Sequence, residues 1–219
     1  MIIMETSSPY EPQTDNFILT EPTLMNGTYT LDLRKENNPV FYGLAEKITN
    51  SVKEVNPNPN LQTLVNEINK NVPKVDRDMG TYRGNVQSAQ EKPTVTIDTF
   101  FDPNKPSPYC LERSLLTQLV LSNFGIESKL LNLRAQSSNE KFPHMNHILL
   151  EVVPPKPSLM NRILKGRNQE VTVIESTSVG NPVSVHTKDE YMKTHEGVGY
   201  KIISISPLSA PNVFEPKNI

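Results

Sequence analysis

Residues 107–125 constrain the fold most strongly, because they predict a helix with a wide buried face. Apolar side chains recur there at spacings of three and four, namely Leu111, Leu115, Leu116, Leu119 and Val120. Ser107 is the expected N-cap, and Pro108 suits the first helical position, where its missing N–H is no loss. Gly125 follows Phe124 where a left-handed residue commonly ends a helix. Such a helix needs neighbours to cover most of its surface.

The only cysteine of the chain, Cys110, falls in the first turn of this predicted helix. Unpaired N–H groups and the positive end of the helix dipole favour a thiolate at that position. Because a thiolate is a nucleophile at neutral pH, the position indicates chemistry as well as packing. A lone cysteine in an apolar helix is more often a small core residue, and this alternative stays open.

The composition excludes several classes of protein. The chain has 219 residues, enough for one domain with its own core. Its net charge is −2, and it has neither a basic run nor a tryptophan, so nucleic-acid binding is disfavoured. One cysteine permits no internal disulfide and no cysteine-rich zinc site. Without a signal peptide or a membrane-spanning run, we expect a cytoplasmic protein, with secretion by a signal-less route as the alternative.

Three segments are predicted along the chain: a polar arm over residues 1–37, a cysteine-nucleophile domain over 38–206, and a tail over 207–219. The arm is expected to dock loosely, apart from a short strand around Tyr29 to Leu33. Asn38-Pro39 and Asn58-Pro59 predict the starts of two amphipathic helices, which would pair as a hairpin. The apolar face of the first helix is predicted to comprise Phe41, Leu44, Ala45, Ile48, Val52 and Val55, and that of the second Leu61, Leu64, Val65 and Ile68.

The second half of the chain has the pattern of a sheet. Alternating or apolar runs predict strands at residues 94–98, 128–133, 147–153, 171–175 and 200–205, with a short helix over 188–195. The joins between the middle strands suit antiparallel neighbours. The predicted fold class is therefore α+β, with a helical hairpin and a buried cysteine-bearing helix packed on an antiparallel sheet.

A histidine and a carboxylate are placed to join the cysteine. His147 begins one predicted strand, and Glu175 ends the next. If these strands are adjacent and antiparallel, both side chains lie near one edge of the sheet, which the N-terminus of the cysteine helix could face. Cys110, His147 and Glu175 would then form a triad, in which the imidazole takes the thiol proton and the carboxylate fixes the tautomer.

Other residues compete for these roles. His144 is an alternative base, although its surroundings predict a loop. Glu175 has the alternative of being an exposed charge at the end of a strand, and three other side chains are rival partners for the imidazole: Ser176, Thr177 and Asp98. Glu112 complements the helix dipole. His186 and His195 have no ligand cluster around them, so no metal site is predicted.

Several of these motifs resemble the arylamine N-acetyltransferases, which belong to the papain- and transglutaminase-like group of Cys-His-Asp proteins. The resemblance spans roughly residues 41–182 and is carried by Cys110-Leu111-Glu112, Gly125-Ile126-Glu127, the run from His147 to Val152, and Val173-Ile174-Glu175 with Gly180 shortly after. Asn58 to Leu64, followed by Val72-Pro73, is similar to the start of that family.

The resemblance implies a papain/transglutaminase-like core with Cys110 as the acyl-carrying nucleophile, His147 as the base and Glu175 as the orienting carboxylate. It also implies acetyl-CoA or another acyl-CoA as co-substrate. The chain departs from the family at four points, one of which is an unexpected basic insert from Lys156 to Arg167. A glutamate stands for the triad aspartate, residues 106–109 replace the usual arginine and glycines, and little chain follows Ile205 for the C-terminal domain of that family.

Three hypotheses for the function follow. The first is ping-pong acyl transfer from an acyl-CoA to a small-molecule amine through a thioester on Cys110. The second is a transglutaminase-like thiol protease, or a glutamine deamidase or transglutaminase, acting on protein or peptide amides. The third is a binding module that kept the fold without the reaction.

Overall fold

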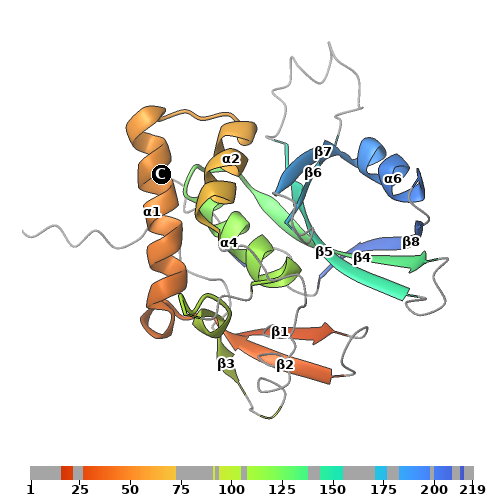
Figure 1. The fold of residues 1–219 in the computed structure, drawn as a ribbon, viewed down its shortest axis with the longest axis horizontal. Coiled ribbons are helices and arrows are strands. Elements are labelled where there is room, and N and C mark those ends of the chain that lie inside the picture. The colour runs from red at the N-terminus through yellow and green to blue at the C-terminus, as the bar shows by residue number, and fades with distance from the viewer. Residues whose placement is uncertain are drawn as a thin grey trace, which may run out of the picture.

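The computed structural model describes residues 16–21, 27–72, 91, 94–104, 108–137, 144–154, 171–176, 183–197, 200–208 and 213–214. The fold is mixed α+β, with a three-stranded sheet, a five-stranded sheet and helices packed against them. Figure 1 shows helices α1, α2 and α4 together on one side of the five-stranded sheet, with α6 on the other side. The predicted α+β class is confirmed at this level.

The helical hairpin consists of α1 (Pro39–Val55) and α2 (Leu61–Asn71), which pack against each other as predicted. The N-cap of α2 is Asn60, whose Oδ1 accepts a hydrogen bond from the Thr63 N–H at 2.8 Å, so the helix starts beyond the predicted Asn58-Pro59 signal. Val55 is the last residue of α1 and is 86% exposed. The predicted apolar face of α1 therefore ends at Val52.

The N-terminus of α1 is capped by a residue that is distant in sequence. The Asp98 carboxylate accepts hydrogen bonds from the N–H groups of Val40 (2.9 Å) and Phe41 (2.7 Å). Asn38 forms no side-chain cap; its amide instead donates to the carbonyl oxygen of Asp32. Asp98 is thus engaged at the start of α1, where a carboxylate complements the helix dipole, and its interpretation as a partner of the imidazole is wrong.

The three-stranded sheet is formed by β1 (Asn16–Glu21), β2 (Gly27–Asp32) and β3 (Val95–Thr96). β1 pairs antiparallel with β2, which corrects the prediction of a loosely docked arm for residues 16–21. β3 pairs parallel with β2. It is shorter than the predicted strand at 94–98, because the chain continues from Ile97 as the 3₁₀ helix η2 (Ile97–Phe100).

Both chain ends contribute to the main hydrophobic core. Leu31 and Leu33 come from the predicted arm, and Val213 and Phe214 come from the predicted tail; all four are fully or almost fully buried. The ring centroids of Phe214 and Phe41 are 6.2 Å apart. The described parts of the arm and the tail therefore belong to the same core as the central domain.

The five-stranded sheet is antiparallel throughout and has the order β7-β6-β5-β4-β8. Its strands are β4 (Ser128–Ser137), β5 (His144–Val152), β6 (Thr172–Glu175), β7 (Ser184–Thr187) and β8 (Tyr200–Pro207). β5 starts three residues earlier than predicted, so His147 lies inside the strand and His144 begins it. β7 is short and was not predicted, because four residues with two polar ends give little alternation.

The two faces of this sheet pack against different partners. Leu130, Leu150 and Ile174 join the main core with α1, α2 and α4. The opposite face forms a second, smaller cluster around Tyr191 of α6 (Lys188–Gly197), comprising Leu131, Leu133, Ala135, Leu149 and Val173. Since successive residues of a strand point to opposite faces, His147 and Leu149 share the face of this second cluster.

Within the described residues, the helices are too short or too polar to cross a membrane. Residues 155–170 lie outside the described residues and include most of the basic connection that the sequence predicts from Pro154 to Gln169. Most of the polar, irregular stretch from Val72 to Lys92 also lies outside them.

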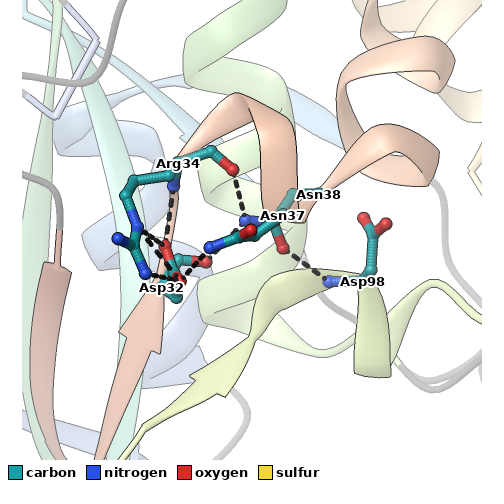
Figure 2. Close-up of polar contacts among 5 residues, drawn as sticks. All are labelled: Asp32, Arg34, Asn37, Asn38 and Asp98. Carbon is teal, nitrogen blue, oxygen red and sulfur yellow. Dashed lines mark hydrogen bonds and ion pairs between the residues drawn. The ribbon is translucent and has the colours of Figure 1, made fainter.

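A buried carboxylate holds the turn between β2 and α1 (Figure 2). Asp32 accepts hydrogen bonds from the backbone N–H of Arg34 (3.0 Å), the Arg34 guanidinium (2.6 Å at the shortest) and the Asn37 amide (2.7 Å). The hydrogen bonds from Arg34 are the main cause that lowers the pKa of Asp32 to about 2. The ionised carboxylate is therefore part of the folded state.

We predict that Asp32→Asn destabilises the protein at neutral pH by about 1–2 kcal/mol, the value of the pKa shift after a discount for the half-exposed Arg34. The pKa of Asp32 is depressed in the folded state, so its contribution is complete above the ordinary pKa and is lost as the pH falls toward 2. Urea unfolding at pH 7 and pH 3 measures it. The difference between wild type and variant should shrink at pH 3; an equal difference at both pH values would contradict this account.

Candidate functional site

The candidate nucleophile is placed by α4 (Cys110–Ser122), a helix that is buried on all sides. It contacts α1 and α2 as well as β4 and β5, so its apolar stripe is covered as predicted. The remaining surface of the helix is buried too, although it bears polar side chains such as Arg113, Ser114, Thr117 and Gln118. Cys110 is the first residue of the helix and is 3% exposed. Its predicted place in the first turn is confirmed.

The start of α4 differs from the prediction. The N-cap is Tyr109, so Pro108 precedes the helix, and Ser107 lies outside the described residues. Oε2 of Glu112 accepts a hydrogen bond from the Tyr109 N–H at 2.9 Å, which is the reciprocal half of a capping box. Glu112 thus provides a hydrogen bond as well as the predicted complement to the dipole, which explains why it tolerates complete burial.

The other end of α4 is closed by the predicted glycine. Gly125 has φ +70°, in the left-handed region. Its N–H donates to the Ser122 carbonyl and the N–H of Ile126 donates to the Leu121 carbonyl, both at 3.0 Å. These paired bonds define a Schellman motif. With both ends satisfied, the helix holds Cys110 at a fixed place in the core.

The strand pairing brings the predicted histidine and carboxylate together. Glu175 ends β6 and stands directly opposite Leu149 of β5, two residues from His147 on the same face. His147 Nε2 lies 3.5 Å from Glu175 Oε1, and both side chains are largely buried, at 9% and 16% exposure. The distance is longer than a charge-assisted hydrogen bond, and catalytic contacts of this kind often tighten only when substrate binds.

Tyr191 of α6 lies beside this pair, and the sequence analysis missed it. It belongs to the same buried cluster as Leu149 and Leu133, the residues directly opposite Glu175 and His147 in the sheet. Burial raises the pKa of Tyr191, and the negative charges of Glu175 and Cys110 raise it further. The tyrosine is therefore neutral and keeps its proton.

The packing of α4 on the sheet determines which side of the sheet Cys110 lies on. The leucines of α4 pack on one face of the sheet, whereas His147 and Glu175 lie on the other. Cys110 belongs to the main core cluster with those leucines. A direct Cys110–His147 contact stays a prediction.

The rival residues have other surroundings. The Ser176 hydroxyl is buried without a hydrogen-bond partner among the described residues, and Thr177 lies outside them. His186 Nε2 is 2.8 Å from the Ser184 hydroxyl, and its ring centroid is 5.9 Å from that of Tyr191. His144 starts β5 rather than lying in a loop. In the described part of the chain, no group of three or more potential ligands could hold a metal ion.

Arg113 was also missed, because a charged residue in an amphipathic helix is normally assigned to solvent. It lies one turn after Cys110 and is 6% exposed. Sequence spacing could have placed it on the same side of the helix as Cys110, since positions three and four residues apart share one side, but spacing does not predict its burial.

The chain was also compared with known proteins. It matches no family model, no curated protein and no solved structure.

We predict that Glu112→Ala destabilises the protein by about 1–3 kcal/mol, because it leaves the Tyr109 N–H without its acceptor at a buried helix start. Glu112→Gln retains an oxygen acceptor and should lose less. Urea unfolding measures both, with Glu127→Ala at an exposed position as the control. If the alanine and glutamine variants were both as stable as wild type, the capping interaction would not contribute to the free energy of unfolding.

Proposed function

We propose that the chain is an enzyme that transfers an acyl group through a thioester on Cys110, on a papain/transglutaminase-like core. His147 is the base and Glu175 is the carboxylate that orients it. The observation that carries the proposal is the 3.5 Å approach of His147 Nε2 to Glu175 Oε1, on the face of the sheet that Tyr191 covers. The resemblance to arylamine N-acetyltransferases supplies the acyl donor, an acyl-CoA, and a small amine as acceptor.

The proposal gives each ring nitrogen of His147 one role, and the distance to Glu175 supports it. Nε2 of His147 faces the carboxylate, and in the proposed mechanism the other ring nitrogen, Nδ1, accepts the thiol proton. Glu175 then stabilises the imidazolium that results. Both side chains are largely buried, which strengthens this interaction relative to one in water.

The reaction proceeds in two halves. The Cys110 proton passes to His147, and the thiolate sulfur bonds to the acyl carbon of acyl-CoA. The bond from that carbon to the coenzyme sulfur breaks, and the leaving thiolate takes the proton from the imidazolium. An amine then attacks the new thioester and gives its proton to His147, and the Cys110 sulfur leaves and is protonated again.

The place of Cys110 in α4 supports the two charged steps. The positive end of the helix dipole stabilises the thiolate at this position, and also the oxyanion formed on the carbonyl. Tyr191 keeps its proton next to these charges, so it offers a hydrogen-bond donor rather than a second negative charge.

Incubation with acetyl-CoA followed by intact-mass and peptide analysis tests the proposal. We predict one acetyl group on Cys110 in the wild type and none in Cys110→Ser. His147→Ala should slow acylation by about a hundredfold or more, and Glu175→Gln by at least about tenfold. His186→Ala and Glu151→Gln are the matched controls, since they remove a histidine and a carboxylate from the same sheet and should acylate like the wild type.

A wild-type chain that never acquires the acetyl group would rule out acyl-CoA as donor. Release of ammonia from a glutamine-containing protein, dependent on Cys110 and His147, would then support the amide-directed hypothesis instead. Absence of both reactions would favour the binding module.

A further inference from the structure

Arg113 is a buried cation for which the described residues supply no counter-charge. Its Nε has no hydrogen-bond partner, and none of the acidic side chains described forms an ion pair with it. Burial alone lowers its pKa, without any contribution from a neighbouring carboxylate. A guanidinium stays charged at physiological pH, and a buried charge without a partner is strongly unfavourable. An anion is therefore expected beside it.

Ser114 is a second buried polar group on the same side of α4. It is fully buried, and its hydroxyl has no partner among the described residues. Cys110, Arg113 and Ser114 stand at positions i, i+3 and i+4, which share one stripe of a helix. Thr117, the next residue of the stripe, has its hydroxyl occupied, because it donates to the Arg113 carbonyl at 2.8 Å.

The direction of these side chains links them to the thiol. In an α-helix the Cα–Cβ bonds tilt toward the N-terminus, so the Arg113 and Ser114 side chains lean toward the turn that contains Cys110. One turn of helix is about 5 Å long, well within the reach of an arginine side chain. An anion held by the guanidinium would thus lie next to the reacting sulfur.

We propose that Arg113 and Ser114 form a carboxylate-binding subsite for the substrate whose reacting carbon Cys110 attacks, or for the acceptor that follows it. This inference rests on the proposed function, since it assigns the substrate class of the same site. A guanidinium pairs with a carboxylate through two parallel N–H···O bonds, and the serine hydroxyl supplies one more donor.

The short separation also decides which anion fits. The phosphates of an acyl-CoA are separated from its thioester by the whole pantetheine arm, which is far longer than one helical turn. The anion beside Arg113 therefore belongs to the part of a small molecule within a few bonds of the reacting carbon. We infer a substrate that carries its own carboxylate.

Two alkylating reagents of nearly equal size test the subsite. Iodoacetate bears a carboxylate and iodoacetamide a neutral amide; each forms an S–C bond with the Cys110 thiolate and releases iodide. The ratio of the iodoacetate to the iodoacetamide rate constant cancels changes in thiolate fraction. Dividing it by the same ratio for N-acetylcysteine removes the difference in intrinsic reactivity of the two reagents. We expect a ratio above one in the wild type and a loss of about tenfold in Arg113→Gln, the value of one charge-assisted hydrogen bond.

Controls separate the possible outcomes. Arg113→Lys should retain part of the preference, and Arg134→Gln, which removes the same charge from an exposed position, should retain all of it. Acetate should slow the reaction of iodoacetate with the wild type in a saturable manner. Thermal unfolding of each variant verifies that it folds. The ratio measured for the wild type tests the subsite even if a variant does not fold.

A normal iodoacetamide reaction with a wild-type ratio of one or less would overturn the subsite and leave the proposed function in place. A raised ratio that Arg113→Gln does not change would overturn the role of Arg113. If Cys110 reacted with neither reagent, the proposed function and the subsite would both fail.

Discussion

The complete burial of α4 is the constraint on which the rest of the structure depends. All of its residues are buried, the polar ones included, so the helix must be covered by the α1–α2 hairpin on one side and by the sheet on another. Its ends need partners inside the protein, which the Glu112 carboxylate and the turn at Gly125 provide. A helix held in this way fixes the position of its first residue, Cys110.

The antiparallel pairing of β5 with β6 brings His147 and Glu175 together. Because this register places Glu175 opposite Leu149, a histidine two residues away on the same face comes within 3.5 Å of the carboxylate. Neither side chain needs a specialised loop to bring them together. α6 then covers that face with Tyr191, and the pair beneath it is largely buried.

Periodicity and capping patterns predicted the helices and most strands, because each of these elements buries one face and therefore has a regular apolar spacing. The pairing of His147 with Glu175 also followed from strand positions alone. Long-range polar contacts were not predictable in this way. Asp98 caps a helix that starts almost sixty residues earlier, whereas the sequence offered it only as a rival partner for the imidazole. The burial of Arg113 and Tyr191 depends on how the helices pack, which local sequence does not encode.

The central claim, that Cys110 is a nucleophile activated by His147, is tested most directly by the pH dependence of Cys110 alkylation with iodoacetamide in wild type and in His147→Ala. The account predicts a wild-type profile with its midpoint well below that of an ordinary cysteine, about 8.5, and a return toward that value in the variant. A slow wild-type reaction with an ordinary profile, unchanged by the substitution, would contradict the account and would identify Cys110 as a structural core residue.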